Sequence, residues 1–229
     1  CPAVRIIATS DAPLNIGNET VYPVPPLSAE DAARLLIDRI TAVSPKFLVD
    51  DQNRAPLEHI CQRLHGNPLA IELVAARVRI LSLAQIADQL NSLSIENDTH
   101  TLRAALEWSY GWLGEPARLL LDRLAVFAGG WTLAAVESYI STGFLNVTNL
   151  LAQLSNAALV SAQPSNSGQA RYRLHETIRS FALEKLRASG EEQAIRRNHR
   201  DGLLMLAIQA ESNLHGGQQG MALKRLESE

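Results

Sequence analysis

The side chains best suited to nucleophilic catalysis or metal binding are few and scattered. The chain contains six histidines and two cysteines, Cys1 and Cys61. Among the histidines only His59 and His65 stand close together, and a helix end is expected between them, so they do not share a face as metal ligands must. Nothing around Cys61 marks the base and the orienting group that cysteine catalysis requires. We therefore expect no metal site and interpret Cys61 as a small buried residue of a helix.

Phosphate chemistry is equally incomplete in these 229 residues. The loop G-x-x-x-x-G-K-[ST], which cradles phosphates, is absent, as is an acidic residue placed after an apolar strand to hold magnesium. The G-x-S-x-G turn of serine hydrolases is also absent. We predict that the chain is not itself an enzyme.

Composition places the chain among ordinary globular proteins. Its hydrophobic content of 46% is too high for disorder, and a net charge of -3 gives no general attraction to nucleic acid or anionic membranes. The sequence shows no membrane-spanning run and no secretory signal, and two cysteines are no disulfide framework, so we expect a cytoplasmic protein without membrane contact. Because the chain opens on Cys1 rather than methionine, we expect it to be part of a longer protein.

The first half of the sequence predicts one short strand followed by helices. The β-branched run Val4–Thr9 is typical of a buried parallel strand, whose sheet partners would have to come from elsewhere. Ser28 is a good N-cap for a helix, and a second helix is expected over residues 55–64. Gly66 should end that helix, and the following Asn67-Pro68 pair and the Ser82-Gln85 pair should each begin another.

The second half predicts one helix over residues 101–113 and then the order helix, helix, helix, hairpin, helix. Helices are expected over residues 101–113, 114–127, 132–140, 149–156 and 176–188, with strands over 158–162 and 170–174. This is the order of a winged-helix domain with an extra helix. The predicted fold class is mainly α, with a helical lid domain, a winged-helix domain with a β-hairpin, and a short N-terminal strand left from an α/β domain. The predicted units are residues 1–27, 28–98, 99–190 and 191–229, the last being the start of a helical-repeat sensor region.

A winged helix raises the question of DNA binding, which needs cations on the reading helix. The expected reading helix, residues 149–156, carries no charge, and no Lys or Arg occurs between Leu124 and Ala170. The cations that follow, from Arg171 to Arg187, make the last strand and helix somewhat basic. They fit either a DNA-facing surface or a solvated or interdomain face.

Several motifs, in order, resemble the STAND NTPases, closest to the bacterial AfsR-like and LuxR-like transcriptional regulators that are related to NB-ARC domains. The stretches that carry the resemblance are Ile6–Ser10, Val21–Leu27, Gly66–Leu73, Thr101–Tyr110, Leu124–Gly130 and Tyr172–Arg179. The resemblance implies a nucleotide switch that binds ADP or ATP. A P-loop domain would precede this chain, a helical-repeat domain would follow it, and DNA would be contacted only by regions outside it.

The resemblance also implies binding residues. Thr9 and Ser10 match a sensor of the γ-phosphate, although Asp11 stands where that family has an arginine and would repel phosphate. The Gly-x-Pro motif matches Gly66 and Pro68, with Leu69 following, and its proline would pack on adenine. The same residues fit equally well as ordinary turn residues at the start of a helix.

The histidine that the family offers to the β-phosphate of ADP matches His175, which could equally be a surface or capping residue. Without a P-loop, the chain alone is expected to bind no cofactor. The leading interpretation is the lid and winged-helix part of a STAND-type regulator. The alternatives are an interaction scaffold whose ATPase has decayed and a DNA-binding winged helix.

Overall fold

The computed structural model describes residues 4–10, 13–93, 98–140, 146–163 and 170–214. Helices dominate the first half of this part of the chain; they are α1 (Ala29–Val43), α2 (Arg54–Arg63), α3 (Pro68–Ala75), the short 3-10 helix η1 (Ala76–Arg79), α4 (Leu83–Asn91) and α5 (Asp98–Gly111). The second half mixes helices with short strands; these elements are α6 (Glu115–Leu124), β1 (Trp131–Thr132), α7 (Leu133–Tyr139), α8 (Val147–Asn156), β2 (Ser161–Gln163), β3 (Arg171–Arg173), α9 (Glu176–Ala188) and α10 (Glu192–Leu214).

Capping residues set where many of these helices begin. The side chains of Ser28, Asn67 and Thr132 each accept a hydrogen bond from a backbone N–H in the first turn of α1, α3 and α7. Ser82 and Gln85 form the reciprocal capping box expected at the start of α4. The predicted helix starts at these positions are confirmed, because each cap satisfies a donor that the helix itself leaves unpaired.

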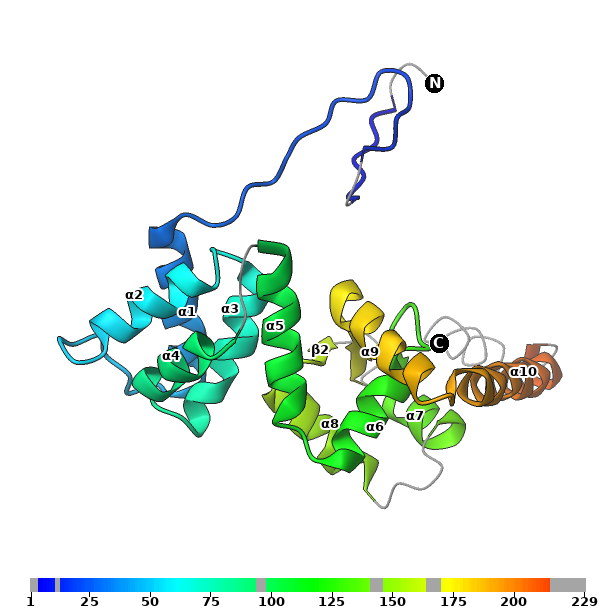
Figure 1. Ribbon diagram of the computed structural model, residues 1–229. Coiled ribbons are helices and arrows are strands. Elements are labelled where there is room, and N and C mark those ends of the chain that lie inside the picture. The colour runs from blue at the N-terminus through cyan, green and yellow to red at the C-terminus, as the bar shows by residue number, and fades with distance from the viewer. Residues whose placement is uncertain (1–3, 11–12, 94–97, 141–145, 164–169, 215–229) are drawn as a thin grey trace.

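The strand predicted at Val4–Thr9 is wrong for this chain. The described residues 4–10 form no strand and are exposed, with Ile7 97% accessible, and the N-terminal ribbon runs away from the helices (Figure 1). A strand forms only when neighbouring strands pair with its backbone, and the described residues offer none to this segment. Asp11, the residue that departs from the family pattern, lies outside the described residues.

The second half has the arrangement of a winged helix. Its small antiparallel sheet has the strand order β1-β3-β2, with Tyr172 of β3 between Trp131 of β1 and Ala162 of β2. The prediction of a mainly α fold with a winged-helix domain is confirmed. The two-residue strand β1 was not predicted, and β2 begins later than expected because Ala158 adopts a positive φ of 57° after α8 ends.

One continuous cluster of buried side chains runs from Ala32 in α1 to Ile195 in α10. Helix α5 lies between the two halves of the molecule in Figure 1, and it packs against α3 on one side. Arg77 of η1 is only 8% exposed and donates to the backbone oxygen and the hydroxyl of Ser109 in α5, at 2.8 and 2.9 Å. The division between residues 98 and 99 stays a prediction. Within the described ranges, no helix is both long and apolar enough to cross a membrane.

Candidate functional site

The turn between α2 and α3 is built around Gly66. This residue is buried with φ of +65°, and a Cβ atom there would overlap the carbonyl oxygen of Leu27. The backbone N–H of Leu27 donates to the carbonyl of Gly66 at 3.0 Å. Gly66 therefore lets the chain that enters α1 lie directly against the start of α3, which only a residue without a side chain permits.

Asn67, Pro68 and Leu69 form the first turn of α3. The Asn67 side chain accepts from the backbone N–H of Ala70 at 3.0 Å, and Pro68 occupies the first helical position, where its missing N–H costs nothing. Pro68 is exposed, whereas Leu69 is half-buried and packs against the core. Of the two, Pro68 is therefore the one available for contact with a ligand or partner.

His175 is the N-cap of α9. Its Nδ1 atom accepts from the backbone N–H of Thr177 at 3.3 Å, and the residue is exposed. A neutral imidazole that accepts at Nδ1 carries its proton on Nε2, so the outer nitrogen is a hydrogen-bond donor. The capping role considered for His175 is thus present, and it leaves one ring nitrogen available.

A cleft of about 510 Å³ opens between the α3–α5 side and α9. Its apolar lining comes from Leu102, Leu106 and Phe181, and the first turns of two helices contribute Asn67 and Thr177. The structure therefore brings Asn67 and Thr177 to one cleft, whereas the predicted residues Gly66, Pro68, Leu69 and His175 are not among the residues that line it. Thr9 and Ser10 are exposed residues of the extended N-terminal segment and do not line it.

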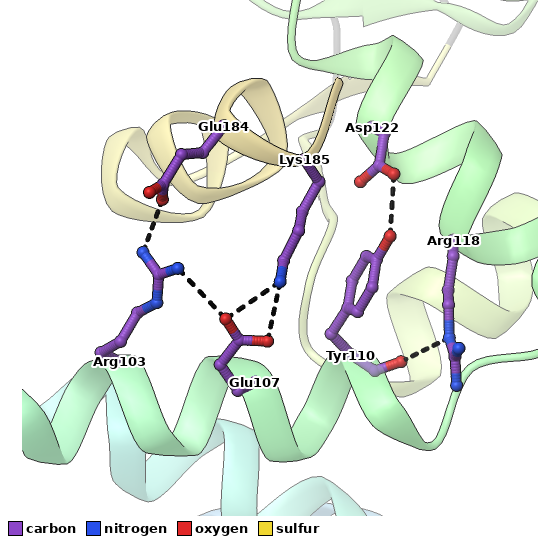
Figure 2. Close-up of polar contacts among 7 residues, drawn as sticks. All are labelled: Arg103, Glu107, Tyr110, Arg118, Asp122, Glu184 and Lys185. Carbon is purple, nitrogen blue, oxygen red and sulfur yellow. Dashed lines mark hydrogen bonds and ion pairs between the residues drawn. The ribbon is translucent and has the colours of Figure 1, made fainter. Parts of the chain in front are cut away.

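Ion pairs join α5 to α9 beside this cleft (Figure 2). Arg103 of α5 pairs with Glu184 of α9, and also with Glu107 one turn along its own helix at 3.1 Å. Lys185 of α9 donates to both carboxylate oxygens of Glu107, at 3.0 and 2.9 Å. These pairs are partly exposed, so each adds little stability, but together they fix the register of α9 on α5.

A more buried contact links α5 to α6. The hydroxyl of Tyr110 donates to Oδ2 of Asp122 at 2.8 Å, and Arg118 donates to the backbone oxygen of Tyr110 at 3.0 Å (Figure 2). Burial raises the pKa of Asp122 from 3.8 to about 6, although the bond from Tyr110 and the charge of Lys185 oppose the shift. Sequence reasoning missed this pair. The available signal was an acidic residue in the apolar run of α6, where Asp122 is only 7% exposed.

The exposed side of α8 is polar and uncharged. Helix α8 exposes Thr148, Asn149, Gln153 and Asn156 and contains no charged residue. Arg79 of η1 donates to the Asn156 side chain at 2.8 Å, so a cation from the first half lies at the C-terminal end of α8.

The hairpin beside α8 adds two arginines. Arg171 donates to the backbone oxygen of Gly129 at 3.2 Å, and Arg173 is exposed. Within the described ranges, no ion pair engages the guanidinium of Arg173, and no group of three or more potential metal ligands is found. Among the described residues, α8 therefore presents amides with Arg79 at its C-terminal end, and the hairpin adds the exposed guanidinium of Arg173.

Comparison with known proteins identifies the same domain. Residues 113–187 match the family model described as a winged helix-turn-helix domain. The chain is 40% identical over 220 residues to a Mycobacterium tuberculosis protein provisionally named an HTH-type transcriptional regulator, and equally to its Mycobacterium bovis counterpart. It is 36% identical over 218 residues to an uncharacterized protein of Mycobacterium tuberculosis.

These similarities extend well beyond the winged helix. The first alignment covers 90% of this chain and the second 89%, so both include helices of the first half. The chain spans a quarter of the length of the first relative and 55% of the second. It thus contains a winged helix-turn-helix domain and is homologous to proteins named as transcriptional regulators, each of them longer than this chain.

Proposed function

We propose that this chain is a regulatory segment of a cytoplasmic transcriptional regulator and that it acts by binding rather than by catalysis. The observation that carries the proposal is the winged helix of residues 113–187 within a 40% identity that also covers the preceding helices. Because this alignment covers 90% of the chain, the role named for that relative is the guide to the role proposed for this chain.

Contact with DNA is the form of this function that the winged helix and the names of the relatives favour. In helix-turn-helix proteins the second helix of the motif enters the major groove, and here that helix is α8. Asn149 and Gln153 are exposed one turn apart, and such amides can form paired hydrogen bonds with adenine. Arg173 is the nearby uncommitted cation for phosphate, so affinity should be low and only weakly dependent on salt.

The test is fluorescence anisotropy with a panel of duplexes of different sequence, measured at two salt concentrations. We expect weak binding, with a slope of log affinity against log salt of about -1 to -2, because few phosphates are contacted. The double variant Asn149→Ala with Gln153→Ala should reduce sequence preference, and Arg173→Ala should weaken binding to every sequence equally. Gln193→Ala, an exposed amide on α10, is the matched control. Absence of binding at low salt would exclude DNA contact by this segment.

A nucleotide-controlled switch of the STAND type is the second candidate, and the cleft between α3 and α9 favours it. The N-terminal ends of two helices border that cleft, and such ends attract anions such as phosphate. Pro68 would pack on the base, with Gly66 and Leu69 shaping the turn, and the Nε2 atom of His175 would donate to a phosphate. Thr9 and Ser10 would take part only if the N-terminal segment joins a sheet of a P-loop domain.

Under this second proposal ADP or ATP binds between this segment and a P-loop domain of the same protein, while a helical-repeat region acts as the sensor. Calorimetry on a natural form that carries the P-loop should show ADP binding that His175→Ala weakens about tenfold, as loss of one hydrogen bond to a charged group implies. His59→Ala, at a half-buried position of α2 whose imidazole bonds to Asn91 and does not line the cleft, should leave it unchanged. Equal affinities for the His175 variant and the unaltered protein would count against the switch.

A further inference from the structure

The junction of α5, α6 and α9 contains a buried carboxylate that is only half satisfied. Oδ2 of Asp122 accepts from Tyr110, but Oδ1 is buried and has no hydrogen-bond partner in the described part of the chain. A buried charged oxygen without a partner is costly, whereas a protonated carboxyl group carries no charge and could fill the same space. Asp122 is therefore a position where a proton can be taken up without rearranging the fold.

The positive charges near Asp122 are bonded to other groups and do not pair with its carboxylate directly. The ammonium nitrogen of Lys185 in α9 lies 5.4 Å from the centre of the Tyr110 ring, but it forms its ion pair with Glu107 of α5. Arg118 of α6 points to a backbone oxygen, and Glu191, before α10, adds a negative charge to the surroundings. Helix α8, which also packs on α6, contributes no charged side chain. No ion pair to Asp122 is found among the described residues.

The position of Tyr110 connects this carboxylate to both halves of the molecule. Its ring meets Phe181 of α9 edge to face at 5.5 Å, and its helix, α5, packs against α3 of the first half. The charge state of Asp122 acts directly on the hydroxyl of Tyr110. A change in the charge of Asp122 therefore alters the packing of Tyr110 at the place where α5, α6 and α9 meet.

We propose that Asp122 is a proton-sensitive site in the contact between α5 and the winged helix, where protonation stabilises the fold and ionisation destabilises it. The carboxyl group titrates near pH 6 in the folded protein, because burial outweighs the opposing contributions of Tyr110, Lys185 and Arg118. A folded pKa above the unfolded value of 3.8 means that the native state binds more protons between these values. Stability contributed by Asp122 is therefore present at low pH and is lost as pH rises through about 6.

The size of the effect follows from linkage. For a carboxyl group with a pKa of 3.8 unfolded and about 6 folded, the unfolding equilibrium constant rises about tenfold between pH 5 and pH 7.5. Asp122→Asn keeps the shape and an acceptor for Tyr110 but cannot ionise. The variant should lack this tenfold increment, whereas Asp38→Asn, at an exposed position of α1, should retain it.

The experiment is urea unfolding of the whole chain at both pH values, with hydrogen exchange to locate the change. We expect the Asp122→Asn difference from the unaltered protein to depend on pH, and the amides of residues 107–111 to exchange more slowly in the variant at pH 7.5. Identical pH dependence in the two proteins would overturn the proposal.

A second measurement needs no substitution. The NMR signal of the Asp122 carboxyl carbon should titrate with a midpoint near pH 6. The Tyr110→Phe variant should move this midpoint upward, because it removes a hydrogen bond to the ionised carboxylate. A midpoint near the unfolded value of 3.8 would also overturn the proposal.

Discussion

Replacing Gly66 by alanine tests whether this residue is required for the fold before any ligand is considered. The positive φ of +65° disfavours a residue with a Cβ atom by about 1–2 kcal/mol, of which roughly 0.4–1 kcal/mol is recovered because alanine restricts the unfolded chain. The new methyl group would also displace Leu27, with loss of the 3.0 Å backbone bond, at about 0.5–1.5 kcal/mol. We expect a total destabilisation of about 2–3 kcal/mol, once the lost packing of Leu27 is included.

Gly190 provides a matched control for the backbone part of this cost. It also has a positive φ, of +78°, but no atom lies within 4 Å of the place that a methyl group would occupy there. Gly190→Ala should therefore cost only about 1 kcal/mol, which is the backbone contribution alone. Urea unfolding should show a lower midpoint for both variants at an unchanged slope, with the larger drop for Gly66→Ala. Equal losses in the two variants would refute the argument that the backbone of Leu27 requires glycine at position 66.

Three further predictions concern other parts of the fold. Burial raises the pKa of Cys61 to about 11, so at pH 8 only about 0.1% of it is thiolate; alkylation followed by peptide mass analysis should find it protected until urea unfolds the chain, and rapid labelling of the native protein would contradict this. Ser82→Ala should cost about 1 kcal/mol, because Gln85 cannot complete the capping box alone, and urea unfolding that shows no loss would speak against the cap. Arg77→Lys should cost more than about 1 kcal/mol, since an ammonium group cannot reproduce the guanidinium bonds to Ser109; a thermal midpoint equal to that of the unaltered protein would disprove it.

Local signals made much of the fold predictable. Caps such as Asn67 and Thr132 determine helix starts through contacts within three residues, so they can be read without tertiary information. The strand predicted at Val4–Thr9 failed for the opposite reason, because pairing depends on segments far away in sequence. The late start of β2 depends on the left-handed conformation of Ala158. Alanine rarely adopts this conformation, so the sequence carries no signal for it.

In the candidate site, too, local contacts could be predicted from the sequence and contacts between helices could not. The cap formed by His175 was foreseen as an alternative because it lies at a hairpin-to-helix junction. The pairing of Tyr110 with Asp122, and the cleft shared by α3 and α9, depend on how helices pack and could not be derived from spacing. The nucleotide contacts at Pro68 and His175 remain proposals.

The place of α5 has a consequence for how such proteins can evolve. The matched winged-helix region starts at residue 113, just after α5, yet Asp122 and Lys185 inside it rely on Tyr110 and Glu107 before it. Recombination that cut the gene at that boundary would leave the buried carboxylate of Asp122 without its hydrogen bond from Tyr110 and would expose Phe181 to solvent. Shuffling should therefore carry α5 along with the winged helix, and paired substitutions across position 113 should accumulate in descendants.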